Sequence, residues 1–192
     1  GALHLRSDNV ISWDDVGRSR TWGPSGEPID DLAAHEGRVS GVAQLQWGDV
    51  ISWGDARHVR WWTEQGELMS ELKHEVRPMG VCPLSGDGFL LWGLDGSLWL
   101  HTGDRGFTQL SDFRSGCSGA LHLSNDTFVS RHQDGMLRMW SSSMETVKSL
   151  NAHNQEVWGL TKLSDKTILS FGADGTLCRW SDTGDLFPRK YR

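Results

Sequence analysis

Ser170, His153 and Asp174 together hold the three residue types of a nucleophilic triad. In such a triad the serine hydroxyl attacks a carbonyl carbon, the imidazole takes the proton, and the carboxylate orients the imidazole. One active site needs one such set, yet His35 and Ser52 form a partial copy at the same spacing earlier in the chain. Recurrence is typical of a structural network, because buried polar side chains must be paired. The sequence therefore predicts no catalytic residues and no enzyme.

Eleven tryptophans offer a second chemistry, since an exposed indole can stack on a sugar ring. This composition supports a lectin-like, glycan-binding alternative. Four aromatic residues, however, recur one place after the serine position and are expected to pack between neighbouring sheets: Trp13, Trp53, Trp92 and Phe171. Four tryptophans occupy positions that hold no other tryptophan: Trp47, Trp61, Trp99 and Trp158. Trp61 and Trp99 lie within predicted strands, where packing is expected, so Trp158 becomes the more interesting candidate for binding.

The overall charge and the metal-binding residue types argue against several functions. A net charge of −6 provides no basic field for phosphates, which disfavours nucleic acid and anionic membrane surfaces as partners. No apolar run approaches the roughly 18 residues that a membrane helix needs. Cys82, Cys117 and Cys178 lack CxxC spacing and the eight histidines are scattered, so no disulfide framework, metal site or cofactor is predicted. Free thiols fit a reducing compartment, and we expect a cytoplasmic protein.

The strongest signal in the sequence is an internal repeat. Five segments open with a glycine followed by a mainly apolar stretch, at Gly1, Gly41, Gly80, Gly119 and Gly159. These glycines are 40, 39, 39 and 40 residues apart. A period of this length that covers the whole chain is typical of solenoids and propellers.

Each repeat reads as four short strands separated by turns. An apolar pair such as Val50-Ile51 marks a buried second strand, and turns such as Asp134-Gly135 lead into a third strand that usually ends in tryptophan. A turn such as Gln65-Gly66 then precedes a fourth segment of mixed polarity. A helical solenoid would need apolar residues at three- and four-residue spacing, but glycine and aspartate interrupt every such stretch. Four strands per repeat predict the blade of a β-propeller.

The predicted fold is therefore all-β, one domain of residues 1–192 that forms a five-bladed β-propeller of four-stranded antiparallel blades. The expected blades are approximately 1–34, 35–73, 74–112, 113–152 and 153–192. Each could be built from contiguous sequence, because the chain begins at a first strand and ends within a fourth. An array that did not close would leave two apolar faces in water. The alternatives are a five-bladed ring closed between the first and fifth repeats, or a fragment or half-ring of a larger propeller that pairs as a homo-oligomer.

The residue types that recur in these repeats resemble those of the WD-repeat family. In that family a histidine, a serine, an aspartate and a tryptophan form a buried hydrogen-bond network within a blade. The resemblance assigns these residues to that network: His35, Ser52, Asp55 and Trp62; His74 and Asp95; Ser130, Asp134 and Trp140; His153, Ser170, Asp174 and Trp180. Only the fifth repeat matches fully. Asp55 lies one place early, Phe113 holds the histidine position of the fourth repeat, and Leu91 and His101 replace serine and tryptophan in the third.

The resemblance also implies a binding surface, the rim where the chain enters each first strand and each tight turn. By position this candidate rim comprises Arg38, Ser40, Arg77, Met79, Leu94, Gln133, Glu156, Trp158 and Ala173. Arginine, tryptophan and methionine are enriched at the centres of protein interfaces. We therefore expect a protein-protein interaction or scaffolding module with a protein or peptide partner. The alternatives are the glycan-binding propeller and an engineered or excised fragment with no partner of its own.

Overall fold

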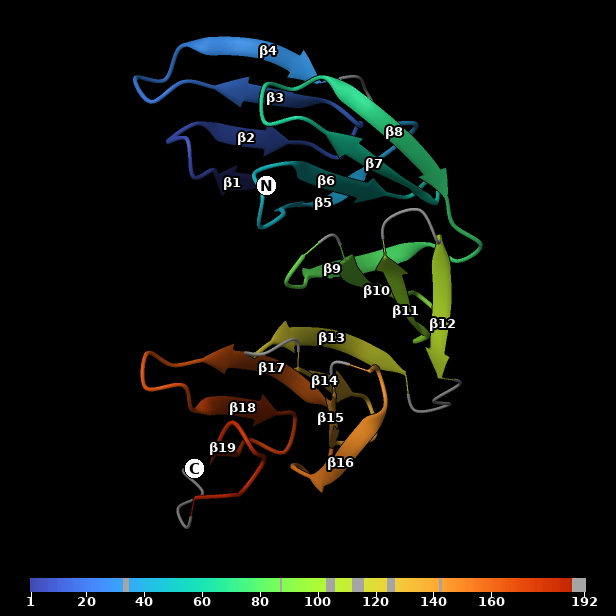
Figure 1. The fold of residues 1–192 in the computed structure, drawn as a ribbon, viewed down its shortest axis with the longest axis vertical. Helices are drawn as coiled ribbons and strands as arrows, with labels where there is room; N and C mark the ends of the chain where they lie inside the picture. Colours follow the sequence, from blue (N-terminus) through green and yellow to red (C-terminus); the bar gives the residue numbers. More distant parts are fainter. Residues whose placement is uncertain are drawn as a thin grey trace. The chain divides into compact units, whose positions relative to one another are not determined.

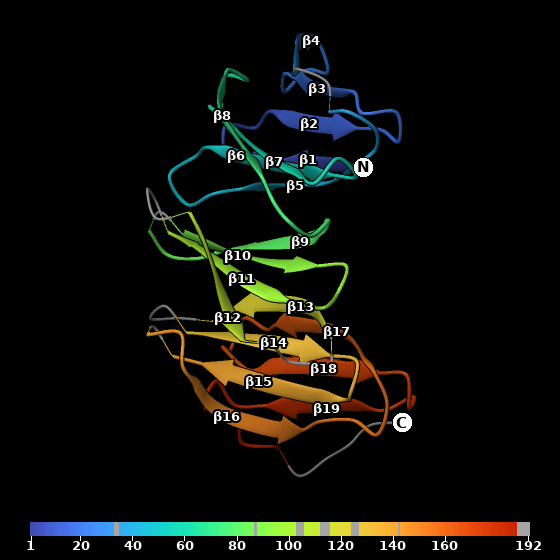
Figure 2. The same cartoon turned by 90° about the vertical axis from the view of Figure 1, so that its right-hand side faces the viewer.

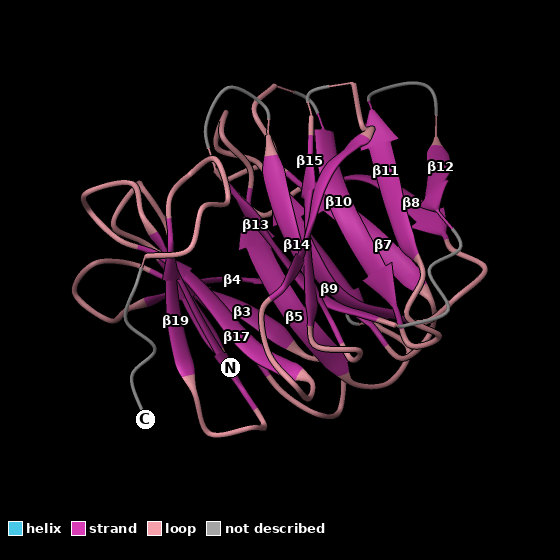
Figure 3. Cartoon of the chain, turned by 90° about the horizontal axis from the view of Figure 1, so that it is seen from below, coloured by secondary structure: helices cyan, strands magenta, loops and turns pink. Residues whose placement is uncertain are grey.

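The computed structural model describes residues 1–32, 35–86, 88–102, 106–111, 116–123, 127–141 and 143–187. All regular elements in these ranges are strands, which confirms the all-β prediction (Figure 3). They are β1 (Ala2–His4), β2 (Val10–Trp13), β3 (Ser19–Trp22), β4 (Pro28–Leu32), β5 (Val39–Gln44), β6 (Val50–Gly54), β7 (His58–Trp62), β8 (Leu68–Lys73), β9 (Pro78–Pro83), β10 (Gly88–Gly93), β11 (Leu98–Thr102), β12 (Phe107–Ser111), β13 (Cys117–His122), β14 (Phe128–His132), β15 (Met136–Trp140), β16 (Thr146–Asn151), β17 (Val157–Lys162), β18 (Ile168–Gly172) and β19 (Leu177–Trp180).

The strands form five antiparallel sheets, one for each predicted repeat. The first four sheets hold β1–β4, β5–β8, β9–β12 and β13–β16, each with strands in sequence order (Figure 1). The fifth holds β17–β19, and its fourth segment makes only an isolated bridge, between Trp180 and Leu186. The chain forms two compact units, Gly1–Gly86 and Asp87–Arg192. The predicted blade content is therefore present, with three strands in place of four in the described part of the last sheet.

Aspartate-glycine turns connect the second and third strands as the sequence predicts. Gly135 and Gly175 have φ angles of 81° and 73°, in the left-handed region that glycine enters without strain. The aspartate before each of them accepts the amide of the residue after the glycine: Asp134 from Met136 at 3.0 Å and Asp174 from Thr176 at 3.0 Å. These local hydrogen bonds fix the hairpin and so the register of the third strand.

The glycine that opens a repeat lies beneath a large side chain of the next strand. Gly41 pairs with Trp53 and Gly159 with Phe171, and a Cβ atom on either glycine would overlap the facing ring. The absence of a side chain therefore lets the ring lie flat on the neighbouring strand. This close approach is a physical reason why glycine recurs at the start of the repeats. It also shows that the recurrent aromatic residues cover their own sheet.

The core of the first unit lies between its first two sheets. Leu5 and Ile11 of the first sheet meet Val50 and Trp62 of the second, all four no more than 2% exposed. Figures 1 and 2 show these sheets as neighbours. Alternation of apolar residues along each strand supplies this contact, because successive side chains point to opposite faces.

The second unit has an equivalent core between its last two sheets. Val129 and Leu137 of the fourth sheet meet Ile168 and Trp180 of the fifth. Cys82, Cys117 and Cys178 are free thiols and all three are buried. Within the described ranges no helix has the length and apolar character needed to cross a membrane.

Candidate functional site

The fifth sheet brings His153, Ser170, Asp174 and Trp180 into one hydrogen-bonded chain. The Trp180 indole N–H donates to the Ser170 hydroxyl at 2.9 Å, and that hydroxyl lies 2.8 Å from His153 Nε2. The indole can only donate, so the serine oxygen accepts from it. The Asp174 carboxylate can only accept, so the His153 proton lies on Nδ1 and Nε2 accepts a hydrogen bond from the Ser170 hydroxyl. His153 Nδ1 then donates to Asp174, 3.1 Å away. Ser170 is fully buried (0% exposed), so no substrate carbonyl can reach its oxygen.

Asp174 is held as a carboxylate at the end of this chain. Burial by itself would raise the pKa of Asp174, but the opposing hydrogen bonds outweigh it and hold the pKa well below the ordinary value. They come from the Asn154 amide, from the Thr176 hydroxyl and amide, and from His153. The three residue types of a triad thus serve to tie the loop before β17 to the turn after β18.

The second sheet repeats the arrangement without its aspartate. Trp62 donates to Ser52 at 2.8 Å, and His35 Nε2 lies 2.7 Å from the same hydroxyl. Among the described residues His35 Nδ1 has no hydrogen-bond partner. Asp55, assigned to this network from the sequence, instead pairs with Arg77 at 2.6 Å. Asp55 lies one residue before the aspartate position of the repeat, and its carboxylate therefore lies at the rim instead of in the network.

The fourth sheet takes its histidine from an unexpected position. Trp140 donates to Ser130 at 2.8 Å, as the repeat pattern predicts, and the second partner of Ser130 is His132 Nε2 at 2.8 Å. Phe113, in the histidine position of this repeat, lies outside the described residues. Asp134 pairs with Arg138 at 2.8 Å. The sequence held one signal for this contact. Residues two apart lie on the same face of a strand, as Ser130 and His132 do in β14.

The third sheet replaces the polar network with aromatic contacts. His101 stacks on Phe89 with ring centroids 4.9 Å apart and meets Phe107 edge-on at 5.2 Å. Leu91, at the serine position, is fully buried. His74, assigned to this network, instead makes a 2.9 Å contact from Nδ1 to the Val76 carbonyl. The other assigned residue, Asp95, accepts the amide and hydroxyl of Ser97 at 2.9 and 2.5 Å.

Burial disfavours the charged form of His35 and of His132. It lowers the pKa of His35 to about 4, with the positive charge of Arg60 adding to the effect. It likewise lowers the pKa of His132 to about 4, with Arg138 contributing. A neutral ring can accept the serine proton, whereas an imidazolium ring cannot. The lowered pKa values therefore agree with the direction of the hydrogen bonds.

In the first unit the candidate rim contains a patch around an ion pair. The Arg77 guanidinium binds the Asp55 carboxylate, and the Asp55 amide donates to the Arg38 carbonyl at 3.0 Å. Arg38 is exposed and Met79 is 44% exposed beside them, while Ser40 is half-buried. We call Arg38, Asp55, Arg77 and Met79 the arginine patch. Asp55 was not predicted as a rim residue, although its early position is the feature that places it there.

In the second unit the candidate rim contains a patch around Trp158, whose side chain is 57% exposed. Glu156 is half-buried, and its carbonyl accepts the amide of Ala173 at 2.9 Å, which joins the entry to β17 to the turn after β18. Beneath them the Arg131 guanidinium donates to the carbonyls of Val157 at 2.8 Å and Trp158 at 2.5 Å. We call Arg131, Glu156, Trp158 and Ala173 the tryptophan patch.

Arg131 was not identified from the sequence, although it stands where other repeats have Trp13, Trp53 or Phe171. That change of residue type was the available signal. The other two predicted rim residues of the second unit, Leu94 (61% exposed) and Gln133, are also exposed.

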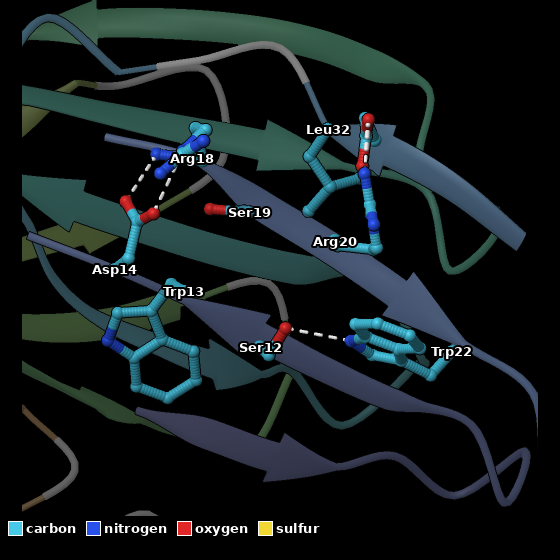
Figure 4. A pocket seen from close by; sticks show the side chains of 9 residues that line it. Ser12, Trp13, Asp14, Arg18, Ser19, Arg20, Trp22 and Leu32 are labelled. Carbon is cyan, nitrogen blue, oxygen red and sulfur yellow. Dashed lines mark hydrogen bonds and ion pairs between the residues drawn. The ribbon is translucent and has the colours of Figure 1, made fainter. Parts of the chain in front are cut away.

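A hollow of about 400 Å³ lies on the first sheet (Figure 4). Figure 4 shows the hydrogen bond between Trp22 and Ser12 and the ion pair between Asp14 and Arg18. The first of these bonds is 2.7 Å long, and Arg20 forms an ion pair with Asp31. In the second sheet the space beside the equivalent serine, Ser52, contains His35. Within the described ranges no cluster of His, Cys, Asp and Glu side chains has the composition of a metal site.

Comparison with known proteins identifies the architecture. No protein-family model matches the chain, and no curated protein matches it in sequence. Among solved structures, the computationally designed Ika8 protein matches with a TM-score of 0.79 and 19% identity, over 94% of this chain and 57% of that one.

Two WD40 domains match the chain as well. The C-terminal WD40 domain of Sif2 has a TM-score of 0.82 and 19% identity over 97% of this chain and 56% of that one. The β-propeller domain of Myceliophteria thermophila Cps50 (Swd1) has a TM-score of 0.82 and 13% identity over 100% of this chain and 71% of that one. The chain thus spans little more than half the length of Ika8 and Sif2, and it has the WD40 β-propeller fold.

Proposed function

We propose that the chain is a non-catalytic protein-interaction module in which the tryptophan patch anchors a peptide or protein partner. The observation that carries this proposal is the combination of an exposed indole with a fixed backbone at Trp158. A residue whose backbone is already fixed before binding loses less conformational entropy on association. Tryptophan is also among the residues that contribute most to binding energy at interfaces.

The surroundings of Trp158 define the chemistry of a suitable partner. The half-buried Glu156 lies two residues before the indole and interacts electrostatically with the half-buried Arg131. Burial lowers the pKa of Arg131 while the charge of Glu156 opposes that shift, so the two groups interact electrostatically. A partner segment with an apolar side chain for the indole and a hydrogen-bond donor for Glu156 would fit the patch.

The arginine patch is a second candidate contact surface, in the first unit. The half-buried Arg77 is oriented by Asp55, and the exposed Met79 provides an adaptable apolar surface two residues later. Methionine tolerates varied partners because its side chain is flexible and polarisable. We propose that this patch binds a partner segment independently of the tryptophan patch.

Peptide selection would test this function directly. A displayed peptide library is selected on the immobilised chain, and affinities of the enriched peptides are compared for the wild type, Trp158→Ala and Arg77→Ala. A matched control is Val147→Ala, whose side chain is 69% exposed on the outer strand β16. We expect Trp158→Ala to weaken binding by at least ~2 kcal/mol, as a hot-spot residue would, with Val147→Ala unchanged. Equal binding by all variants would contradict the proposal.

The glycan alternative predicts a different result from the same protein. Trp47 and Trp158 are the two tryptophans with exposed side chains among the described residues. Trp47 Nε1 already donates to Asp49 at 2.7 Å, so its polar edge is occupied. A titration with simple sugars monitored by tryptophan fluorescence should leave the spectrum unchanged if the partner is a protein.

A further inference from the structure

Trp47 occupies a turn position that is small or polar in every other repeat. The turn joins β5 to β6 in the second sheet, and the equivalent residues of the other repeats are Ser7, Gly86, Asn125 and Asp165. The Trp47 side chain is 43% exposed. An exposed turn on a rigid scaffold is a place where binding residues concentrate. The hairpin does not require an aromatic residue here, so this indole is available for another role.

The backbone on both sides of Trp47 is held by other side chains. The guanidinium of Arg6, from the first sheet, donates to the Gln46 carbonyl. The Gln44 side-chain amide donates to the Gly48 carbonyl at 2.9 Å. The peptide groups before and after Trp47 are therefore fixed. A partner that binds here meets a backbone that is already ordered, which lowers the entropic cost of association.

The indole of Trp47 is oriented by a hydrogen bond of its own. Its Nε1 atom donates to the Asp49 carboxylate at 2.7 Å. Since Nε1 is the only polar atom of an indole, this bond leaves the aromatic ring as the surface that a partner can contact. The face of a tryptophan ring attracts cations, because the ring quadrupole places negative charge there.

The charged groups at this turn also favour a cation. Asp49 and Glu64 are both half-buried. Glu64 accepts from the Gln44 amide at 3.3 Å, and one of its oxygens would lie 3.5 Å from a Cβ atom placed on Gly48. Both carboxylates are thus held by neutral donors, the indole and the amide. Together with Arg6 they give one positive and two negative charges, which is an excess of negative charge.

We propose that this turn binds a basic segment of a protein partner, with a lysine or arginine side chain on the Trp47 ring beside the Asp49 and Glu64 carboxylates. We call Trp47, Asp49 and Glu64 the Trp47 site. The ring supplies the contact surface and the carboxylates supply the charge that selects a cationic side chain. All of these residues belong to one compact unit, Gly1–Gly86.

The Trp47 site is separate from the arginine patch of the same unit. Strand β5 starts next to Arg38, which belongs to that patch, and ends at Gln44, which contacts the Trp47 turn. The strand has 6 residues, so about 20 Å separates its two ends. A partner segment can therefore occupy the Trp47 site without touching the arginine patch.

Peptide selection with a subtraction step tests the proposal. Three displayed libraries carry a fixed central lysine, arginine or leucine, with random flanks that lack lysine and arginine. Each library is depleted on the immobilised Trp47→Ala chain, which removes peptides that bind elsewhere, and is then selected on the unmodified chain. We expect enrichment from the lysine and arginine libraries only. No enrichment, or equal enrichment from the leucine library, would overturn the proposal.

The affinity of an enriched peptide then tests the role of charge. The double variant Asp49→Asn/Glu64→Gln removes both negative charges but keeps an oxygen acceptor for the indole and for the Gln44 amide. We expect it to bind about tenfold more weakly, because the cation loses its electrostatic partners. The control is Trp158→Ala, which removes the exposed indole of the tryptophan patch and should leave the affinity unchanged. Equal binding by the double variant and the wild type would overturn the proposal.

Failure of the Trp47 site and failure of the tryptophan patch give different results. Peptides whose binding is lost in Trp158→Ala, with no basic peptide surviving the subtraction, would remove the Trp47 site and keep the tryptophan patch. A fluorescence change with simple sugars that is absent in Trp47→Ala, again without basic peptides, would overturn the proposal in favour of a glycan at this turn. Circular dichroism would confirm that each variant remains folded.

Discussion

The third and fifth sheets occupy equivalent places in the repeat but stabilise their interiors with different chemistry. The fifth uses a directional chain from Trp180 through Ser170 and His153 to Asp174. The third stacks His101 against aromatic rings and buries Leu91 at the serine position. A fully satisfied polar network and an apolar cluster are both stable, whereas a half-satisfied network is costly. The comparison teaches that the serine and tryptophan positions change together: they are hydrogen-bonded to each other in the fifth sheet, and Leu91 and His101 replace both of them in the third.

Truncating the tryptophan of the polar network should have the largest effect. Trp180→Ala removes a side chain that is 4% exposed and also removes the donor to Ser170. We expect a loss of about 3–5 kcal/mol in the free energy of unfolding. His101→Ala in the third sheet removes a smaller ring and should cost less. Urea denaturation of both variants measures the difference, and an equal loss would contradict it.

Removing the serine at the centre of the network should have the next largest effect. Ser170→Ala leaves the Trp180 N–H and the His153 imidazole without their shared partner in a buried site. Each orphaned group costs about 1–3 kcal/mol, so the two groups together give an expected loss of at least about 2 kcal/mol. Ser12→Ala is the matched control, because Ser12 and Trp22 are half-buried and water can replace the hydroxyl. Its loss should stay below about 1 kcal/mol.

Acidification should weaken the sheets whose histidines are buried and neutral. The pKa of His132 falls from 6.5 to about 4 on folding, so the unfolded chain binds more protons between these values. Stability is therefore present above pH 6.5 and is lost as the pH falls toward 4. His132 alone should account for about 2 kcal/mol between pH 7.5 and pH 5, since one pKa unit corresponds to ~1.4 kcal/mol.

Denaturation curves at several pH values would measure this loss. A His132→Gln variant should show a shallower dependence of stability on pH, because its side chain does not titrate. A slope that is the same for the variant and the wild type would show that His132 is not the titrating group.

The smallest effect should come from the rim. Trp158→Ala removes an exposed side chain that belongs to neither internal network, so the free energy of unfolding should change by no more than about 0.5 kcal/mol. Thermal unfolding followed by circular dichroism is sufficient to check this. A large loss would mean that the indole is a packing residue, and it would weaken the proposed binding role.

The sheets could be predicted from the sequence because the residues that determine them are local and recur in each repeat. The glycine period, the apolar second strands and the aspartate-glycine turns all predict the observed hairpins. The serine-tryptophan hydrogen bond could also be inferred, since its residues recur ten places apart in four repeats, as in Ser52 and Trp62. A repeat multiplies such signals until they become unambiguous.

The histidine partners were harder to predict from the repeat because they do not come from one fixed position in it. His132 reaches Ser130 from the same strand, while His35 and His153 arrive from the segments before their sheets. Arg131 could not be predicted as a site residue because its role depends on carbonyl groups of the next sheet. Contacts between repeats depend on how neighbouring sheets are placed in space, and aligning the repeats in sequence does not give that placement.

The flat side chain that covers an opening glycine makes the two positions a coupled pair. Gly41 and Trp53, Gly119 and Arg131, and Gly159 and Phe171 are all separated by 12 residues, and a Cβ on any of these glycines would collide with its partner. Guanidinium can therefore substitute for an aromatic ring, because both are planar, while a side chain at the glycine would require its partner to move or to become smaller. Degenerate copies of this repeat in other sequences should be recognisable by that 12-residue pairing even where the tryptophans have been lost.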